Sequence, residues 1–61
     1  MRHYLYRIYT EEEEDGMEIL VGADCIGEAE HILAQDETIL MFAYLDELSD
    51  EEAEDSGLDE L

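Results

Sequence analysis

Two segments of the chain contain no acidic residue, residues 1–10 and residues 38–45. Their large apolar side chains are Tyr4, Leu5, Tyr6, Ile8 and Tyr9 in the first, and Ile39, Leu40, Met41, Phe42, Tyr44 and Leu45 in the second. Nearly continuous apolar runs that are rich in aromatic residues are typical of strands shielded on both faces. We therefore predict a strand in each segment, with Thr38 opening the second one.

Residues 17–23 predict a further strand, because apolar side chains recur there at every second position, which is typical of one buried face. The preceding Asp15-Gly16 pair favours a two-residue type I′ hairpin turn. Such a turn would place Ile8 opposite Ala23 and Glu12 opposite Ile19. One face of the hairpin would then carry Tyr4, Tyr6, Ile8, Ile19, Val21 and Ala23. The other face would carry Leu5, Arg7, Tyr9 and Leu20.

An amphipathic helix is predicted after this hairpin, with Asp24 as its N-cap and Gly27 weakening its first turn. Its apolar side would consist of Cys25, Ile26, Ala29, Ile32 and Leu33. Its polar side would consist of Glu28, Glu30, His31 and Gln35. Cys25 is therefore expected to be a core residue.

A helical crossover between the second and third strands makes those two strands parallel. The third strand can add beside the second or beside the first. We favour the order 2-1-3, because it makes the two acid-free segments neighbours and leaves the second strand at the edge. The predicted fold is thus α+β, a small two-layer β-β-α-β sandwich over residues 1–48 with one packed helix.

Residues 49–61 are expected to form a short acidic C-terminal helix and tail. Ser49 and Glu52 form a capping-box pattern, and Gly57 suits a left-handed helix end. The chain is expected to fray beyond Leu58.

Charge narrows the function more than any motif does. Twenty residues are Asp or Glu and two are Arg, so the formal net charge is −18. Eighteen charges at the roughly 1.7 Å spacing of phosphates along duplex DNA would cover about 31 Å, close to the size of a folded chain of this length. Such a surface suits a basic partner and disfavours direct binding to nucleic acid or to an anionic membrane. An acidic surface also confers solubility.

The sequence contains no nucleophile elbow, no Gly-rich phosphate loop and no zinc-ligand spacing among His3, Cys25 and His31. We therefore expect no enzyme, no metal site and no cofactor. A lone cysteine builds no disulfide framework, and no apolar run suits export or a membrane span, so a cytoplasmic setting is expected.

Two functional classes remain. In composition and size the chain is similar to the DNA-mimic inhibitors that phages and mobile elements direct against basic nucleic-acid-binding proteins, although no residue motif carries the resemblance. The expected partner-binding residues are Glu11, Glu12, Glu13, Glu14, Asp15, Asp50, Glu51, Glu54 and Asp55. The alternative is a structural or interaction module that forms a homodimer or docks through the strand from Tyr4 to Tyr9. Its apolar interface would comprise Leu5, Arg7, Tyr9 and Leu20, unless Arg7 pairs with Asp24 or a tail carboxylate.

Overall fold

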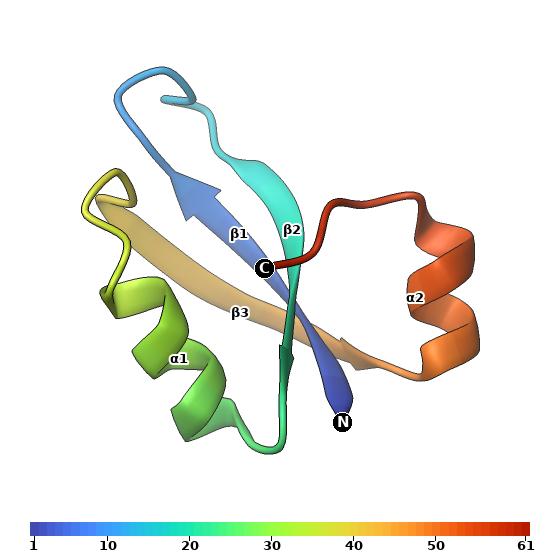
Figure 1. Cartoon of the computed structure of the whole chain (residues 1–61). Coiled ribbons are helices and arrows are strands. Elements are labelled where there is room, and N and C mark those ends of the chain that lie inside the picture. Colours follow the sequence, from blue (N-terminus) through green and yellow to red (C-terminus); the bar gives the residue numbers. More distant parts are fainter.

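The computed structural model describes residues 1–61 and contains one sheet and two helices (Figure 1). The strands are β1 (Arg2–Tyr9), β2 (Met17–Ala23) and β3 (Met41–Leu48), and the helices are α1 (Ile26–Ala34) and α2 (Asp50–Ser56). The strand order is β2-β1-β3, with β1 antiparallel to both neighbours. The predicted α+β fold and strand order are therefore confirmed, and β2 and β3 run parallel to each other.

The hairpin register differs from the predicted one. Ile8 lies opposite Met17 instead of Ala23, a shift of six positions. Asp15 does not have the positive φ that a type I′ turn requires, whereas Gly16 has a φ of 88°. The predicted register would have drawn Glu12 into the strand beside Ile19 on the core face, while the observed longer loop leaves the acidic residues in water.

A register error of six is even, so it leaves every side chain on its predicted face. The hydrophobic core contains the predicted hairpin residues together with two from α1: Tyr4, Tyr6, Ile8, Ile19, Val21, Ala23, Ala29 and Leu33. Tyr4 and Tyr6 are among the largest fully buried side chains. The face that packs against α1, called the α1 face below, is thus built mainly from β1 and β2.

Helix α1 begins one residue later than predicted. Cys25, and not Asp24, is the N-cap, and its side chain makes no capping hydrogen bond. The Cys25 backbone is extended, with φ −154° and ψ 166°, which places the thiol outside the helical face. Cys25 is exposed, so its assignment to the core was wrong.

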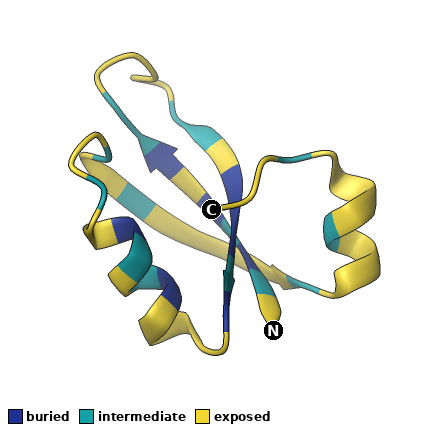
Figure 2. Cartoon of the chain, in the orientation of Figure 1, coloured by how far each residue is buried: buried dark blue, intermediate teal, exposed yellow.

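Strand β3 is far less buried than its sequence predicts. Most of its residues are exposed, and Figure 2 shows this strand largely in the colour of exposed residues. Helix α1 packs chiefly against β2, and so it leaves β3 uncovered. Thr38 does not open the strand, because its N–H and hydroxyl both donate to the Asp36 carboxylate in a turn. A one-residue bulge at Leu45 shifts the pairing with β1 between Tyr44 and Asp46.

The capping box of α2 is confirmed. The Ser49 hydroxyl accepts from the Glu52 N–H, the Glu52 carboxylate accepts from the Ser49 N–H, and Gly57 ends the helix with a φ of 69°. The chain does not fray after Leu58, because residues 59–61 run parallel to β2 and exchange three backbone hydrogen bonds with Leu20 and Gly22. Neither helix is long and apolar enough to cross a membrane.

Candidate functional site

The nine acidic residues expected to bind a partner are all exposed, but they form two separate groups. One group is the loop between β1 and β2, called the acidic loop (Glu11–Asp15), and the other is α2. The acidic loop follows the end of β1, whereas Asp50 of α2 contacts His3 near its start. Seven strand residues separate these places, a distance of about 23 Å. Figure 1 shows the loop and α2 at opposite ends of the sheet, so the fold does not join them into one patch.

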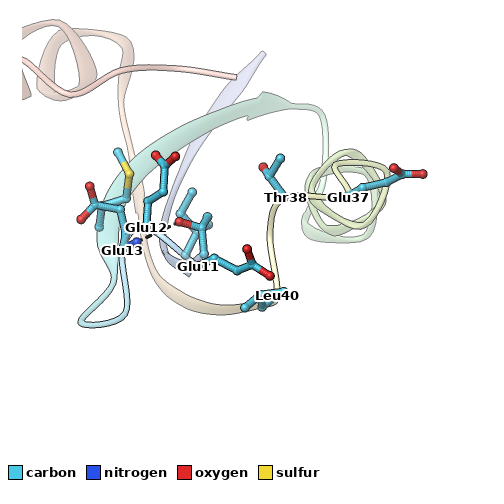
Figure 3. Close-up of a pocket in the computed structure, with 9 residues that line it drawn as sticks. Glu11, Glu12, Glu13, Glu37, Thr38 and Leu40 are labelled. Carbon is cyan, nitrogen blue, oxygen red and sulfur yellow. Dashed lines mark hydrogen bonds between the residues drawn. The ribbon is translucent and has the colours of Figure 1, made fainter.

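An open hollow of about 560 Å³ lies beside the acidic loop. Its polar lining comes from the loop and from the connection between α1 and β3, and its apolar lining is Ile8, Met17 and Leu40. In Figure 3 the Glu11 side chain extends toward Leu40, whereas Glu37 points away from the loop glutamates. The hollow therefore combines carboxylates with aliphatic side chains. The sequence did not predict that Glu37 and Thr38, from the connection between α1 and β3, would line it.

Short-range hydrogen bonds hold the acidic loop in shape. The Glu13 N–H donates to the Thr10 hydroxyl over 3.0 Å, and the Glu13 carbonyl accepts from the Gly16 N–H over 3.1 Å. Gly16 also lies tightly against β1, since a Cβ atom there would be 2.9 Å from Arg7 Cγ and from Tyr9 Cε1. Thr10 and Gly16 thus set the direction in which the loop carboxylates are presented.

The expected apolar interface on the other face of the sheet is only partly accessible. Leu20 is 2% exposed, so its assignment to an interface was wrong. Leu20 lines the same hollow as Ala53 of α2 and Leu58, and residues 59–61 pair with β2 at Leu20. Leu5 and Tyr9 are half-buried, and Arg7 is exposed and forms no ion pair, so the expected pairing of Arg7 with Asp24 or a tail carboxylate is also wrong.

A histidine cluster that the sequence did not reveal ties the two ends of the chain together. His3 Nε2 lies 2.6 Å from Asp50 Oδ1, and His3 Nδ1 contacts Glu60 Oε2. Hydrogen bonds from the ring to Glu60 and then to Asp50 raise the pKa of His3 above its ordinary value. Asp50, predicted as a partner-binding residue, is therefore engaged within the chain.

Two further polar contacts are structural. The Tyr6 hydroxyl donates to Glu30 Oε2 over 3.1 Å, and burial together with this carboxylate raises the pKa of Tyr6 to about 12. Arg2 Nη1 lies 3.5 Å from Glu47 Oε1 at an exposed position, where an ion pair adds little stability. No group of three or more His, Cys, Asp and Glu side chains is arranged to hold a metal ion.

Comparison with protein-family models, with curated proteins and with solved structures finds no match for the chain. Function is therefore inferred from the charge, exposure and spacing of the side chains described above. These side chains offer carboxylates for binding cationic groups, most densely at the acidic loop and along α2.

Proposed function

We propose that the chain is a small acidic binding protein that occupies the nucleic-acid site of a basic protein by presenting carboxylates in place of phosphates. The proposal rests on one observation, the match between charge and length. The formal charge of −18 is spread over a molecule whose longest dimension is 31 Å. Eighteen phosphate charges of duplex DNA occupy about the same length.

The separation of the acidic loop from α2 supports this mode of binding. A basic groove that follows a nucleic-acid backbone meets negative charge along its whole length, and the two acidic groups lie at the two ends of the sheet. The smaller dimensions of the molecule, 22 and 15 Å between Cα atoms, suit a rod that lies along such a groove. Binding of this kind needs no catalytic group.

The hollow beside the acidic loop supplies a specific feature that charge alone lacks. A lysine or arginine of the partner would lay its aliphatic stem on Ile8, Met17 and Leu40 and direct its cationic end to the loop carboxylates. Apolar contacts of this kind distinguish one basic partner from another, because net charge attracts all of them. The proposed setting is the cytoplasm, where a lone cysteine such as Cys25 stays reduced.

Matched charge variants test the proposal. In the first, Glu11, Glu12, Glu13 and Glu14 become Gln. In the control, four exposed acids outside the two groups become amides, namely Glu18, Asp24, Glu28 and Asp59. Both variants lose four negative charges, so they differ only in where the charge is lost. We expect proteins captured from a lysate by the wild type to be released by duplex DNA and by salt, and to be lost with the loop variant but retained with the control.

Capture that persists in high salt and is insensitive to DNA would contradict the proposal. So would equal losses with the loop variant and the control, because the acidic loop would then have no special part in binding.

The alternative of an interaction module keeps one supporting observation, the exposed apolar strand β3. The expected docking strand, β1, is central in the sheet, with both edges paired and with Tyr4 and Tyr6 buried. An interface of this kind therefore belongs to β3, and its binding would persist in salt.

A further inference from the structure

The sheet has a single edge that is unpaired along its length. Strand β1 is paired on both sides, and residues 59–61 hydrogen-bond to the outer side of β2. The outer side of β3 has no neighbouring strand. Alternate N–H and C=O groups of an edge strand point outward and are available to another strand.

The side chains along this edge are apolar and accessible. Leu40 is 66% exposed, Met41 60%, Tyr44 44% and Leu45 45%. The run from Met41 to Leu45 contains no charged residue, although acidic residues make up 20 of the 61 positions of the chain. Natural proteins usually protect an open edge with charged residues, with proline or with a β-bulge; Met41–Tyr44 has none of these, and the bulge at Leu45 follows Tyr44.

We propose that two copies of the chain pair antiparallel through β3 about a two-fold axis at Ala43, which joins two sheets into one of six strands. In this register Ala43 faces Ala43, Phe42 faces Tyr44 and Met41 faces Leu45. Ala43 is exposed, and its small side chain allows the two β3 strands to approach closely at the axis. Phe42 and Tyr44 lie on the α1 face, where each would form a cross-strand aromatic pair with its counterpart.

Charge and ladder length select this register. It confines the ladder to Met41–Leu45, because the bulge at Leu45 ends regular pairing before Asp46 and Glu47, so no two carboxylates face each other across it. A register centred on Phe42 would instead set Tyr44 and Leu45 against Leu40 and Ile39, which precede β3, and so would shorten the ladder. A register centred on Tyr44 would draw the bulge at Leu45 and the carboxylates of Asp46 and Glu47 into the ladder, which interrupts the apolar contact.

Charge also favours a second copy over a basic partner at this edge. A basic protein gains from approaching carboxylates, and the Met41–Leu45 run offers none. A second copy, which carries −18 itself, can approach closely only where the surface is free of acidic residues. The dimer is independent of the proposed partner, and the two interactions respond oppositely to salt: salt weakens attraction to a basic protein and strengthens association of two like-charged chains.

A complementary-charge experiment tests both the edge and the axis. Ala43→Glu places two carboxylates opposite each other in the dimer, and Ala43→Lys places two ammonium groups there. We expect the wild type to sediment as a dimer of its 7.0 kDa chain, with association strengthened between low and moderate salt. Each variant alone should dimerise about tenfold more weakly or worse, and an equimolar mixture of the two should recover dimers.

Gln35→Glu and Gln35→Lys are the matched controls, because Gln35 is exposed at the end of α1 and lies outside the proposed interface. They should leave dimerisation unchanged. Circular dichroism establishes that each variant is folded; should an Ala43 variant fail to fold, Ala43→Cys in a Cys25→Ser background replaces it, and oxidation should link two copies. A monomeric wild type, or single Ala43 variants that dimerise as well as the wild type, would overturn the inference.

Discussion

The environment of His3 in the structure differs most from the one that its neighbours in the sequence suggest. It lies in the acid-free N-terminal segment, yet it contacts Asp50 and Glu60, residues 47 and 57 positions away. Its side chain is only 14% exposed. The imidazole and its two carboxylate partners tie α2 and the C-terminal residues to β1, and local sequence patterns carry no sign of pairings this distant.

This cluster predicts a pH-dependent contribution to stability. Because the pKa of His3 is raised in the folded state, its contribution is fully present below the unfolded value of about 6.5 and is lost as pH rises through the folded pKa. We expect the melting temperature of the wild type to exceed that of His3→Gln most clearly near pH 6, with the difference shrinking at alkaline pH. Thermal unfolding of both proteins between about pH 6 and pH 9 at constant ionic strength measures this.

His31→Gln is the control for the loss of an imidazole, since His31 is exposed and contacts Gln35 rather than a carboxylate. A difference between the wild type and His3→Gln that stays constant with pH, or grows as pH rises, would contradict the role assigned to His3.

At the scale of elements, two glycines end turns with similar backbones but different surroundings. Gly16 closes the acidic loop with a φ of 88°, and Gly57 ends α2 with a φ of 69°. A Cβ atom at Gly16 would lie 2.9 Å from side-chain atoms of Arg7 and Tyr9. A Cβ atom at Gly57 would have no neighbouring atom within 4 Å. The two positions therefore share a positive φ, which would strain any residue with a Cβ atom, and differ in the space around that atom.

Alanine substitution separates these two effects. We expect Gly57→Ala to lower the free energy of unfolding by about 1 kcal/mol, the cost of a left-handed backbone with a Cβ atom. Gly16→Ala should cost about 2 to 3 kcal/mol, because Arg7 and Tyr9 must also move. Urea unfolding of the two variants measures the difference, and equal losses would show that the contact of the loop with β1 is unimportant.

At the scale of the whole molecule, like-charge repulsion opposes folding. The net charge of −18 is confined to a molecule whose longest dimension is 31 Å, and a chain of 61 residues has only a small core to offset the repulsion. The Debye length is about 30 Å at 0.01 M salt and about 8 Å at 0.15 M. At low salt nearly every carboxylate therefore repels every other one, and at physiological salt only neighbours do.

We expect the melting temperature to rise between these two salt concentrations, because screening removes repulsion that is strongest in the folded state. The variant with Glu18, Asp24, Glu28 and Asp59 changed to amides should show a smaller rise. Calorimetry at two protein concentrations separates screening within one chain from strengthening of the dimer. A melting temperature that is flat or falls with salt would contradict the expected repulsion.

The sequence by itself determined that three strands form and which side chains share each face of the hairpin, because these follow from alternation, and the distribution of acidic residues favoured the observed strand order. It placed the start of the third strand at Thr38, three residues before the observed start at Met41. It also determined the ends of α2, since the contacts of Ser49, Glu52 and Gly57 are local. Six of the eight core residues lie on the predicted hairpin face, because an even register error preserves faces. The exposure of the acidic residues was equally predictable from their cost of burial.

Only the tertiary structure decided which distant residues meet. Periodicity is unchanged when a hairpin slides by an even number of residues, so it could not set the register. Composition could not show that α1 would cover β2 and leave β3 open, or that residues 59–61 would pair with β2 and bury Leu20. The His3 cluster and the hollow beside the acidic loop also depend on the tertiary structure. Their residues are distant in the sequence and meet only when the strands pair and the C-terminal residues pack on the sheet.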